Sequence, residues 1–187
     1  MPMLSRDHIE KMGFAAIGEN VQISDRASFY NAAQITLGNH VRIDDFCVLA
    51  AGAGGIFIGD HVHIAVSSSI IGAGKIMLSD FAGLSARVSI VSSSDDYSGE
   101  ALTNPTVPAQ YRKVTQADVF IGKHVIIGTG SVVLPGVTIE EGVAVAALSL
   151  VWKDCKAFGL YAGNPARRMQ ERSRALLDLE KKLLSEK

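Results

Sequence analysis

The hydrophobic positions of this chain recur in segments of six residues. Each segment begins with an aliphatic residue, continues with a short turn often led by Gly or Asp, and then has a small or β-branched residue. Repetition at a short fixed period is the signature of a repeat architecture, and this pattern predicts a parallel β-helix. The clearest segments begin at Ile17, Leu37, Ile43, Ile58, Ile64, Leu78, Leu84, Ile121, Ile127, Val133, Ile139 and Val145.

The short strands between the turns alternate in polarity. In Val62-His63-Ile64 the two outer residues share one face of the strand, and the middle residue takes the other. We therefore expect aliphatic pairs to fill the coil and central residues to lie outside it. Three such edges close a triangular coil of 18 residues, the spacing from Ile121 to Ile139. Earlier coils run longer, and the surplus residues 51–55 (AGAGG) and 72–75 (GAGK) are predicted to be small loops at one corner.

Length and charge narrow the possible functions. The 187 residues suit one domain, in which 1–16 form an N-terminal cap, 17–152 the β-helix, and 153–187 a C-terminal segment and helix. The net charge of −1, with no basic face before the tail, argues against nucleic acid as a partner. No apolar stretch has transmembrane length, and the charged start does not resemble a signal peptide, so we expect no membrane contact and a cytoplasmic location.

Three segments interrupt the repeat. The charges and the spacing of Ile9 and Met12 predict a short helix from Ser5 to Met12 that covers the open end of the coil, as repeat stacks require. Residues 92–118 are polar, contain two prolines, and are predicted to form a protruding loop. Loops of this length are usually functional or disordered. The basic, Leu-patterned tail predicts a helix from about Ala166 to Leu184.

The histidines and cysteines do not favour a metal site. His40, His61 and His124 each occupy the third turn position of a segment, so we expect them to decorate corners of the coil and not to form a zinc triad. Cys47 falls on an inward position, and both it and Cys155 are expected to be reduced structural thiols. We therefore predict no bound metal.

Several motifs resemble those of a known family. The repeat segments, the interruption after Ile90 and the string AGNPAR from Ala162 to Arg167 resemble the left-handed β-helix acyltransferases that use acyl-CoA. The strings DDYSGE at Asp95 and NPTVP at Asn104 are most similar to the small sugar enzymes that N-acylate a nucleotide-linked 4-amino-4,6-dideoxysugar. The resemblance covers most of the chain. It implies an all-β, left-handed parallel β-helix that forms a homotrimer with shared active sites, and it implies acyl-CoA (acetyl-CoA first) and a nucleotide-linked amino sugar as substrates.

The loop composition favours an amine as the acyl acceptor. Sugar O-acetyltransferases of this superfamily are known for a catalytic His in the loop, whereas no His lies between Ile64 and Lys123 here. A sugar hydroxyl needs a positioned base, but an amine needs only to arrive unprotonated and well placed. We expect direct attack on the thioester without a covalent acyl-enzyme. The alternatives are O-acetylation of a saccharide with His63 as base, a γ-type carbonic anhydrase, and a non-catalytic scaffold.

Candidate acceptor residues come from the loop and from one turn. Similar amino-sugar enzymes hold the amino group with a carboxylate and a Ser, which correspond to Asp95 or Asp96 and to Ser85. We prefer Asp95, because its neighbour could be the residue that shapes the turn. The pair could also be solvated turn formers. Tyr97 and Glu100, from the same string, are expected to contact the substrate.

Candidate donor residues lie toward the C-terminus. In similar enzymes the Gly-Asn-Pro turn lies beside CoA and the basic residues after it lie near the phosphates, which implicates Asn164, Pro165, Arg167 and Arg168. Guanidinium groups bind phosphate in a bidentate manner, although both arginines would also suit a solvated helix surface. Small residues that would leave room for the pantetheine arm, but that are also ordinary in β-helix turns, are Gly128, Ser131 and Ala147.

Outward-facing residues suggest further contacts. His63 should point outward one coil below the Ser85 turn, where it could be an acid, a base or a substrate contact, or could face solvent or another subunit. Apolar residues at outward positions predict a row on one side of the prism that packs against a partner subunit. The residues of this row are Phe120, Ile126, Val132 and Leu150.

Overall fold

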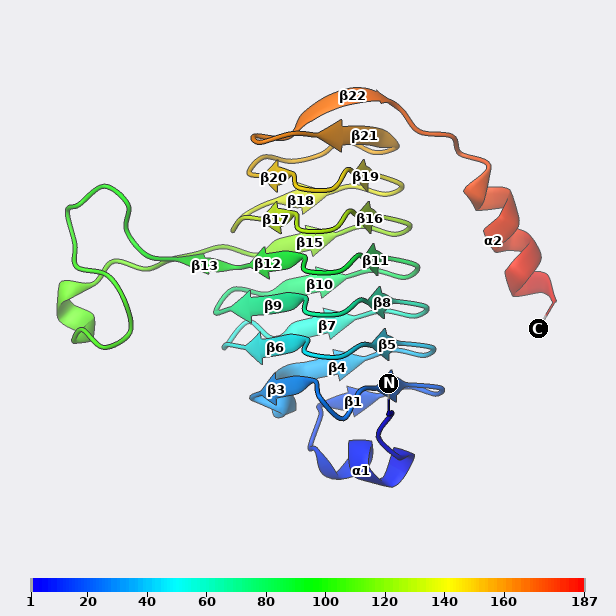
Figure 1. Cartoon of the computed structure of the whole chain (residues 1–187), viewed down its shortest axis with the longest axis horizontal. Helices are drawn as coiled ribbons and strands as arrows, with labels where there is room; N and C mark the ends of the chain where they lie inside the picture. Colours follow the sequence, from blue (N-terminus) through cyan, green and yellow to red (C-terminus); the bar gives the residue numbers. More distant parts are fainter. Residues whose placement is uncertain (1, 187) are drawn as a thin grey trace.

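A computed structural model describes residues 2–186 and confirms the predicted fold class. The chain winds into a parallel β-helix whose three faces are three sheets stacked along one axis (Figure 1). The first sheet contains β1 (Ala16–Ile17), β4 (Ile35–Leu37), β7 (Ile56–Ile58), β10 (Ile76–Leu78), β15 (Val119–Ile121) and β18 (Thr138–Ile139).

The other two faces follow the first around each coil. The second sheet contains β2 (Gln22–Ile23), β5 (Arg42–Ile43), β8 (His63–Ile64), β11 (Gly83–Leu84), β16 (Ile126–Ile127), β19 (Ala144–Val145), β21 (Gly159–Ala162) and β22 (Arg167–Glu171). The third contains β3 (Ser28–Tyr30), β6 (Val48–Ala51), β9 (Ser69–Gly72), β12 (Ser89–Val91), β17 (Val132–Val133) and β20 (Leu150–Val151). A short 3-10 helix, Ala32–Gln34, follows β3.

Aliphatic columns fill the interior of the coil. Ile35, Ile56, Ile76 and Val119 occupy equivalent positions of neighbouring strands in the first sheet, and all four are buried. Burial of one such side chain contributes about 1.5–3 kcal/mol. The predicted alternation is confirmed in β8, where Ile64 is buried and His63 is exposed. The repeat therefore builds a continuous core from contacts between neighbouring coils.

Helix α1 (Arg6–Lys11) covers the N-terminal end of the coil, as predicted (Figure 1). Ser5 caps it, because the Ser5 hydroxyl accepts a hydrogen bond from the His8 N–H at 3.3 Å. Ile9 turns inward and is buried against the core. Neither α1 nor the C-terminal helix combines the length and apolar character that crossing a membrane requires, within residues 2–186.

The turns between the first and second sheets stack aromatic rings on one another. The residues at this position are His40, His61, Phe81 and His124, each with φ between 56° and 59°. Their ring centroids follow one another at 4.5, 4.9 and 5.0 Å. The corner placement predicted for the three histidines is confirmed, and we call this corner of the prism the His edge.

The corner between the third and first sheets, here the loop edge, carries all the surplus residues. The small loops predicted at 51–55 and 72–75 lie there, where the Gly52 N–H donates to the Gly72 carbonyl oxygen at 2.9 Å. The long loop protrudes from the prism, as predicted, and it leaves from this same corner (Figure 1). Its two arms pair as antiparallel strands β13 (Ser93–Ser94) and β14 (Thr115–Gln116), and its tip contains a 3-10 helix, Ala109–Tyr111.

The C-terminal segment differs from the helix predicted over Ala166–Leu184. Arg167–Glu171 forms β22, which runs antiparallel to β21 and provides partners for the edge of that strand. Arg172 then fixes the chain, because its guanidinium donates to the carbonyl oxygens of His124 and Gly142 at 2.9 and 3.0 Å. The coil itself continues through β21, beyond the predicted limit at Trp152.

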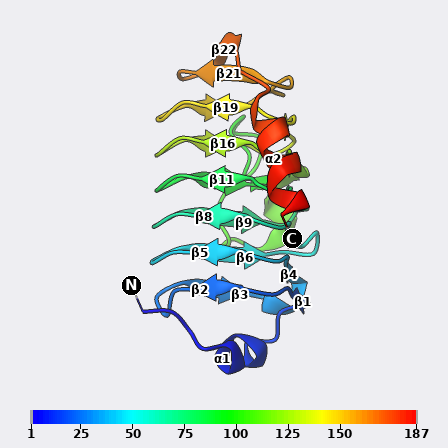
Figure 2. The same cartoon turned by 90° about the vertical axis from the view of Figure 1, so that its right-hand side faces the viewer.

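Only the second half of the tail is helical. Helix α2 (Leu176–Ser185) runs along the His edge (Figure 2), where Glu180 forms ion pairs with Lys123 and, at 2.8 Å, with His124. None of its described side chains is buried. The leucine spacing that predicted the helix starts at Leu176, and the residues before it had only charge in favour of a helix.

The outward apolar residues do point outward, but the predicted single row is wrong. Phe120 lies on the first sheet and Ile126 on the second, whereas Val132 and Leu150 are register partners on the third. Consecutive turns of a triangular coil rotate equivalent residues onto different faces, so a spacing of six residues cannot form a row. The first sheet instead carries an apolar stripe of Phe57, Met77 and Phe120 in register.

The close stacking of turns predicts that glycines differ sharply in their tolerance of alanine. A Cβ at Gly38 would lie 2.6 Å from the backbone carbonyl carbon of Gly59, whereas a Cβ at Gly83 would meet no heavy atom within 4 Å. Gly38→Ala should cost about 1–3 kcal/mol. It should lower the melting temperature by roughly 2–4 °C per kcal/mol. Gly83→Ala is the matched control, and equal melting temperatures for the two variants would contradict this account.

Candidate active site

The corner between the second and third sheets brings several predicted residues into one line. Four turns stack here, and they begin at Ser85, Gly128, Ala146 and Gly163. We call this corner the Ser85 edge. The Ser85 N–H donates to the Ile127 carbonyl oxygen at 2.9 Å, and the Gly128 N–H donates to that of Val145 at 2.8 Å. Ser85, Gly128, Ala147 and the start of the Asn164-Pro165 turn therefore lie along one edge.

Close packing explains why small residues occupy this edge. A Cβ at Gly128 would lie 2.4 Å from the Ala147 backbone nitrogen, so a larger residue would separate the coils. Ser131 is buried, its hydroxyl donates to the Ala146 carbonyl oxygen at 3.0 Å, and it accepts from the Ser149 N–H at 3.2 Å. The Ser131 side chain thus holds the turn from inside the coil. Gly128 is partly exposed and Ala147 is exposed, so both are accessible to a ligand on this edge.

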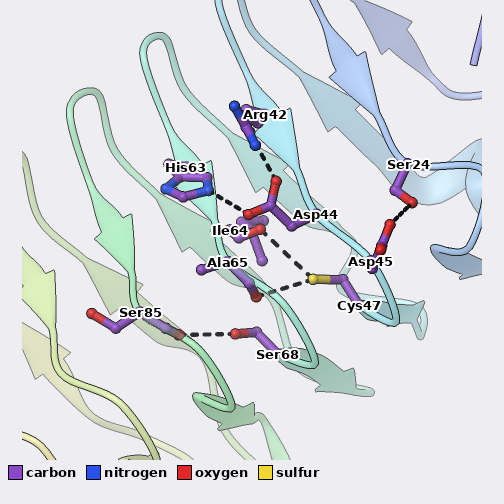
Figure 3. Close-up of polar contacts among 10 residues, drawn as sticks. All are labelled: Ser24, Arg42, Asp44, Asp45, Cys47, His63, Ile64, Ala65, Ser68 and Ser85. Carbon is purple, nitrogen blue, oxygen red and sulfur yellow. Dashed lines mark hydrogen bonds and ion pairs between the residues drawn. The ribbon is translucent and has the colours of Figure 1, made fainter. Parts of the chain in front are cut away.

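An open depression lies beside Ser85 on the second sheet. Its lining includes His63, Gly83, Ser85 and Ile126, together with Ala65, Leu84 and Ala86. Figure 3 shows Ser85 and His63 on successive coils. Gly83 sits between His63 and Ile126 in the register of the sheet, and open space lies where its side chain would be. The depression exists because the coil has a glycine at this outward position.

A buried carboxylate holds the His63 ring. His63 Nε2 lies 2.9 Å from Asp44 Oδ2, and the other oxygen of Asp44 accepts from Arg42 Nε at 2.8 Å (Figure 3). Asp44 is only 8% exposed. Burial alone would raise the pKa of Asp44, but the hydrogen bonds from Arg42 and His63 outweigh it and leave that pKa below its usual value. Asp44 is therefore ionised at neutral pH.

The protruding loop forms a second depression at its base. The lining combines Asp95 and Tyr97 with apolar walls from Val91, Leu134 and Pro135, and with Ser93 and Ser94. Tyr97 is 94% exposed, and Asp95 accepts one long hydrogen bond, from the Asn104 N–H at 3.3 Å. The Asp95 carboxylate thus keeps most of its hydrogen-bonding capacity beside an apolar surface.

Asp96 has a different part in the same loop. Its carboxylate accepts hydrogen bonds from the Ser98 hydroxyl at 2.8 Å and from the N–H groups of Gly99 and Glu100 at 3.0 and 3.1 Å. The Ser98 hydroxyl is the main cause of a lowered pKa for Asp96, and the backbone donors add to it. Asp96 shapes the loop. Glu100 lies farther out, 3.8 Å from Lys113.

The two depressions lie on different corners of one chain. Ser85 and His63 lie at the Ser85 edge, whereas Asp95 follows β12 and lies at the base of the loop, beyond the third sheet. An extended chain rises about 3.3 Å per residue, so the third sheet separates the two corners by on the order of 15 Å. The structure does not bring Ser85 and Asp95 together within one chain.

The predicted phosphate-binding arginines lie at the C-terminal end of the coil. Arg167 and Arg168 line a depression there with Trp152, Lys153 and Tyr161. Arg168 lies 2.5 Å from Glu171 and is partly neutralised. Within residues 2–186, the Arg167 guanidinium donates only to a backbone oxygen, that of Ala166 at 3.0 Å. Asn164 and Pro165 are exposed just before them. Among the described residues, no group of His, Cys, Asp and Glu could hold a metal ion.

Known proteins resemble the chain along almost its whole length. The dTDP-4-amino-4,6-dideoxy-D-glucose acyltransferase of Escherichia coli is 56% identical over 180 residues, which are 96% of this chain and 94% of the relative. This likeness establishes the family as that of the hexapeptide-repeat acyltransferases. The chain belongs to this family of acyl-CoA-dependent sugar acyltransferases. No family model matches it.

Solved structures of the same acyltransferase family share the fold. AntD, an N-acyltransferase from Bacillus cereus in complex with dTDP and 3-hydroxybutyryl-CoA, is 42% identical, with a TM-score of 0.94 over 98% of this chain and 97% of that chain. A variant of AntD in complex with dTDP-4-amino-4,6-dideoxyglucose and coenzyme A is 41% identical, with a TM-score of 0.94 over 99% and 98%. Other AntD structures carry substitutions at one serine and at an aspartate ten positions after it.

The hydrogen bonds of Asp96 predict how the acyltransferase loop responds to acid. Asp96→Ala should accelerate hydrogen exchange at the amides of Gly99 and Ala101, because their acceptor is lost. In the unchanged protein the same amides should stay protected near neutral pH and lose protection only as the pH falls through the lowered pKa of Asp96. Asp95→Ala is the matched control, since Asp95 accepts only from Asn104. Equal exchange rates in the two variants would show that Asp96 does not stabilise the loop.

Proposed function

We propose that the enzyme transfers an acyl group from acyl-CoA to the 4-amino group of dTDP-linked 4-amino-4,6-dideoxyglucose. The proposal rests on the full-length likeness to the E. coli relative, whose name gives that sugar, and to AntD, whose complexes hold it with coenzyme A. Acetyl is the acyl group expected first, and 3-hydroxybutyryl in an AntD complex supports a short chain in general. Both proposed substrates are highly charged, which fits the cytoplasmic location we expect.

The reaction we propose is direct attack of the amine on the thioester. The amine lone pair forms the new C–N bond, the C–S bond breaks, and the proton lost from nitrogen finally joins the departing CoA thiolate. A covalent acyl-cysteine is disfavoured because both thiols are buried. Burial raises the pKa of Cys155 to about 12 and also raises the pKa of Cys47, so neither thiol supplies a nucleophilic thiolate.

Asp95 and Ser85 are the residues we propose for holding the amino group. They stand ten positions apart, as do the aspartate and serine substituted in AntD. Asp95 keeps free acceptor capacity, and its apolar walls suit a deoxysugar, with Tyr97 available to cover the ring. Asp96 and Glu100 would then support the loop more than they contact the sugar.

The donor is proposed to lie along the Ser85 edge. Gly128 and Ala147 leave a narrow path for the pantetheine arm that ends beside Asn164 and Pro165, while Ser131 holds the turn from within. Arg167, Arg168 and Lys153 at the end of this path supply positive charge for the CoA phosphates. This arrangement directs the thioester toward Ser85.

The separation of the two depressions supports the homotrimer with shared active sites that we propose. One amine cannot reach Ser85 and Asp95 when a whole sheet lies between them. A neighbouring subunit related by cyclic symmetry could bring its loop against the Ser85 edge, and closed rings are the usual assembly of identical chains. Exposed apolar side chains on all three faces, such as Phe57, Ile126 and Ile71, are consistent with contacts on several sides.

The reaction is tested by the release of CoA thiol. Acyl-CoA and dTDP-4-amino-4,6-dideoxyglucose should release thiol with each turnover. The matched sugar with a 4-hydroxyl group should release thiol roughly 10²-fold more slowly or not at all, because a neutral hydroxyl is a weaker nucleophile than a neutral amine. A panel of acyl-CoAs in the same assay defines the acyl group. Faster release with the hydroxyl sugar would overturn N-acylation in favour of O-acylation.

The shared site is tested by mixing two inactive variants. Asp95→Asn and Ser85→Ala should each lose on the order of 10²-fold or more in kcat, because each removes a contact to the reacting amine. Co-refolded mixed trimers should regain activity, since some interfaces then combine an intact Ser85 with an intact Asp95. Two samples of the same variant, mixed in the same way, are the control. Mixed oligomers without regained activity, or a fully active monomer in sedimentation, would contradict the shared site.

A further inference from the structure

We propose that Asp44 is a positioning residue that holds His63 as the proton acceptor for the acylated amine. The inference rests on the proposed function and adds two residues to it. Asp44 has no part in the acceptor or donor contacts described above, and it lies on the coil before His63. Its geometry nevertheless ties it to the depression that contains Ser85.

The His63 imidazole borders the depression that contains Ser85. His63 projects from the second sheet between Arg42 of the previous coil and Gly83 of the next. Because Gly83 has no side chain, the side of His63 that faces the Ser85 coil is open. The charged groups next to His63 on the neighbouring strands are Arg42 and Asp44, both on the other side. The ring thus separates a charged pair from an open depression.

The Asp44 carboxylate holds the His63 ring in place. Asp44 is buried, and its two oxygens are divided between His63 Nε2 and Arg42 Nε, at 2.9 and 2.8 Å. A neutral imidazole that donates its Nε2 proton to a carboxylate has its lone pair on Nδ1. Asp44 therefore selects the tautomer whose Nδ1 can accept a proton. Arg42 keeps Asp44 ionised and fixes its orientation.

Such an acceptor gives a defined route to the proton that the amine loses after its attack. When the amine attacks the thioester, its nitrogen acquires a fourth bond and a positive charge, and one N–H proton must leave before the amide can form. Nδ1 of His63 accepts that proton, the C–S bond breaks, and the imidazolium returns the proton to the CoA thiolate. The Asp44 carboxylate stabilises the imidazolium in the interval. Each bond and proton is accounted for without another reactant.

The neighbouring carboxylate supplies a matched control. Asp45 belongs to the same turn, but Figure 3 shows it directed toward Ser24, away from His63, and it accepts a hydrogen bond from the Ser24 hydroxyl. Its other contact is Arg26, at 3.8 Å. Asp45→Asn therefore makes the same chemical change one residue away without touching the imidazole.

The test is a double-mutant cycle measured by thiol release. His63→Asn should lower kcat by roughly 10²–10⁴-fold, the usual contribution of a general base. Asp44→Asn should lower kcat by at least about tenfold while both KM values stay the same, because neither substrate touches Asp44. In the His63→Asn background, Asp44→Asn should change kcat by less than about twofold. Asp45→Asn should keep the wild-type kcat.

Each other outcome overturns the inference. Wild-type kcat in Asp44→Asn, or losses that multiply in the double variant, would show that Asp44 does not act through His63. Should Asp44→Asn fail to fold, Asp44→Glu keeps the charge and displaces the carboxylate, and a wild-type kcat in that variant overturns the inference as well. Wild-type turnover of the amino sugar in the same assay tests the proposed function separately.

Discussion

The structure depends on the repeated contact of each coil with the next. Backbone hydrogen bonds join every strand to its neighbour, and the aliphatic columns inside leave no room for a coil of different width. The turns approach one another as closely as the strands do, and for this reason glycines lie at Gly18, Gly38 and Gly59. A residue on this surface is therefore fixed by its coil and by its place in the turn. Side chains one coil apart in the sequence become neighbours, separated by the distance between adjacent strands of a sheet.

This regularity divides the prism into three corners with different tasks. The His edge packs rings and receives α2, the Ser85 edge is narrow and built from small residues, and the loop edge accommodates insertions. A protein that must bind two substrates can use such a scaffold because each corner changes without disturbing the others. In the homotrimer that we propose, the chemistry lies where corners of different subunits meet, and the core carries none of it.

Much of this organisation was predictable from the sequence, because alternation and period are local signals. The inward columns, the outward His63, the corner histidines and the protruding loop follow from them. Asp44 did not, because its contact with His63 depends on the register of two coils whose corner loops differ in length. The buried Ser131 was open to prediction, since the alternation in Ser131-Val132-Val133 places it inside. The helix predicted for the first half of the tail was wrong, because basic residues are equally compatible with a helix and with an edge strand.

The final strand has a meaning of its own. A parallel β-helix that simply stopped would present a row of unpaired N–H and C=O groups on its last coil, and such edges recruit further strands from other chains. Here β22 reverses direction and lies antiparallel on β21, while α1 closes the opposite end. An antiparallel strand cannot be continued by another parallel coil in the same register. The antiparallel strand thereby covers the C-terminal edge of the second sheet, and the sides of the prism remain as surfaces for the trimer that we propose.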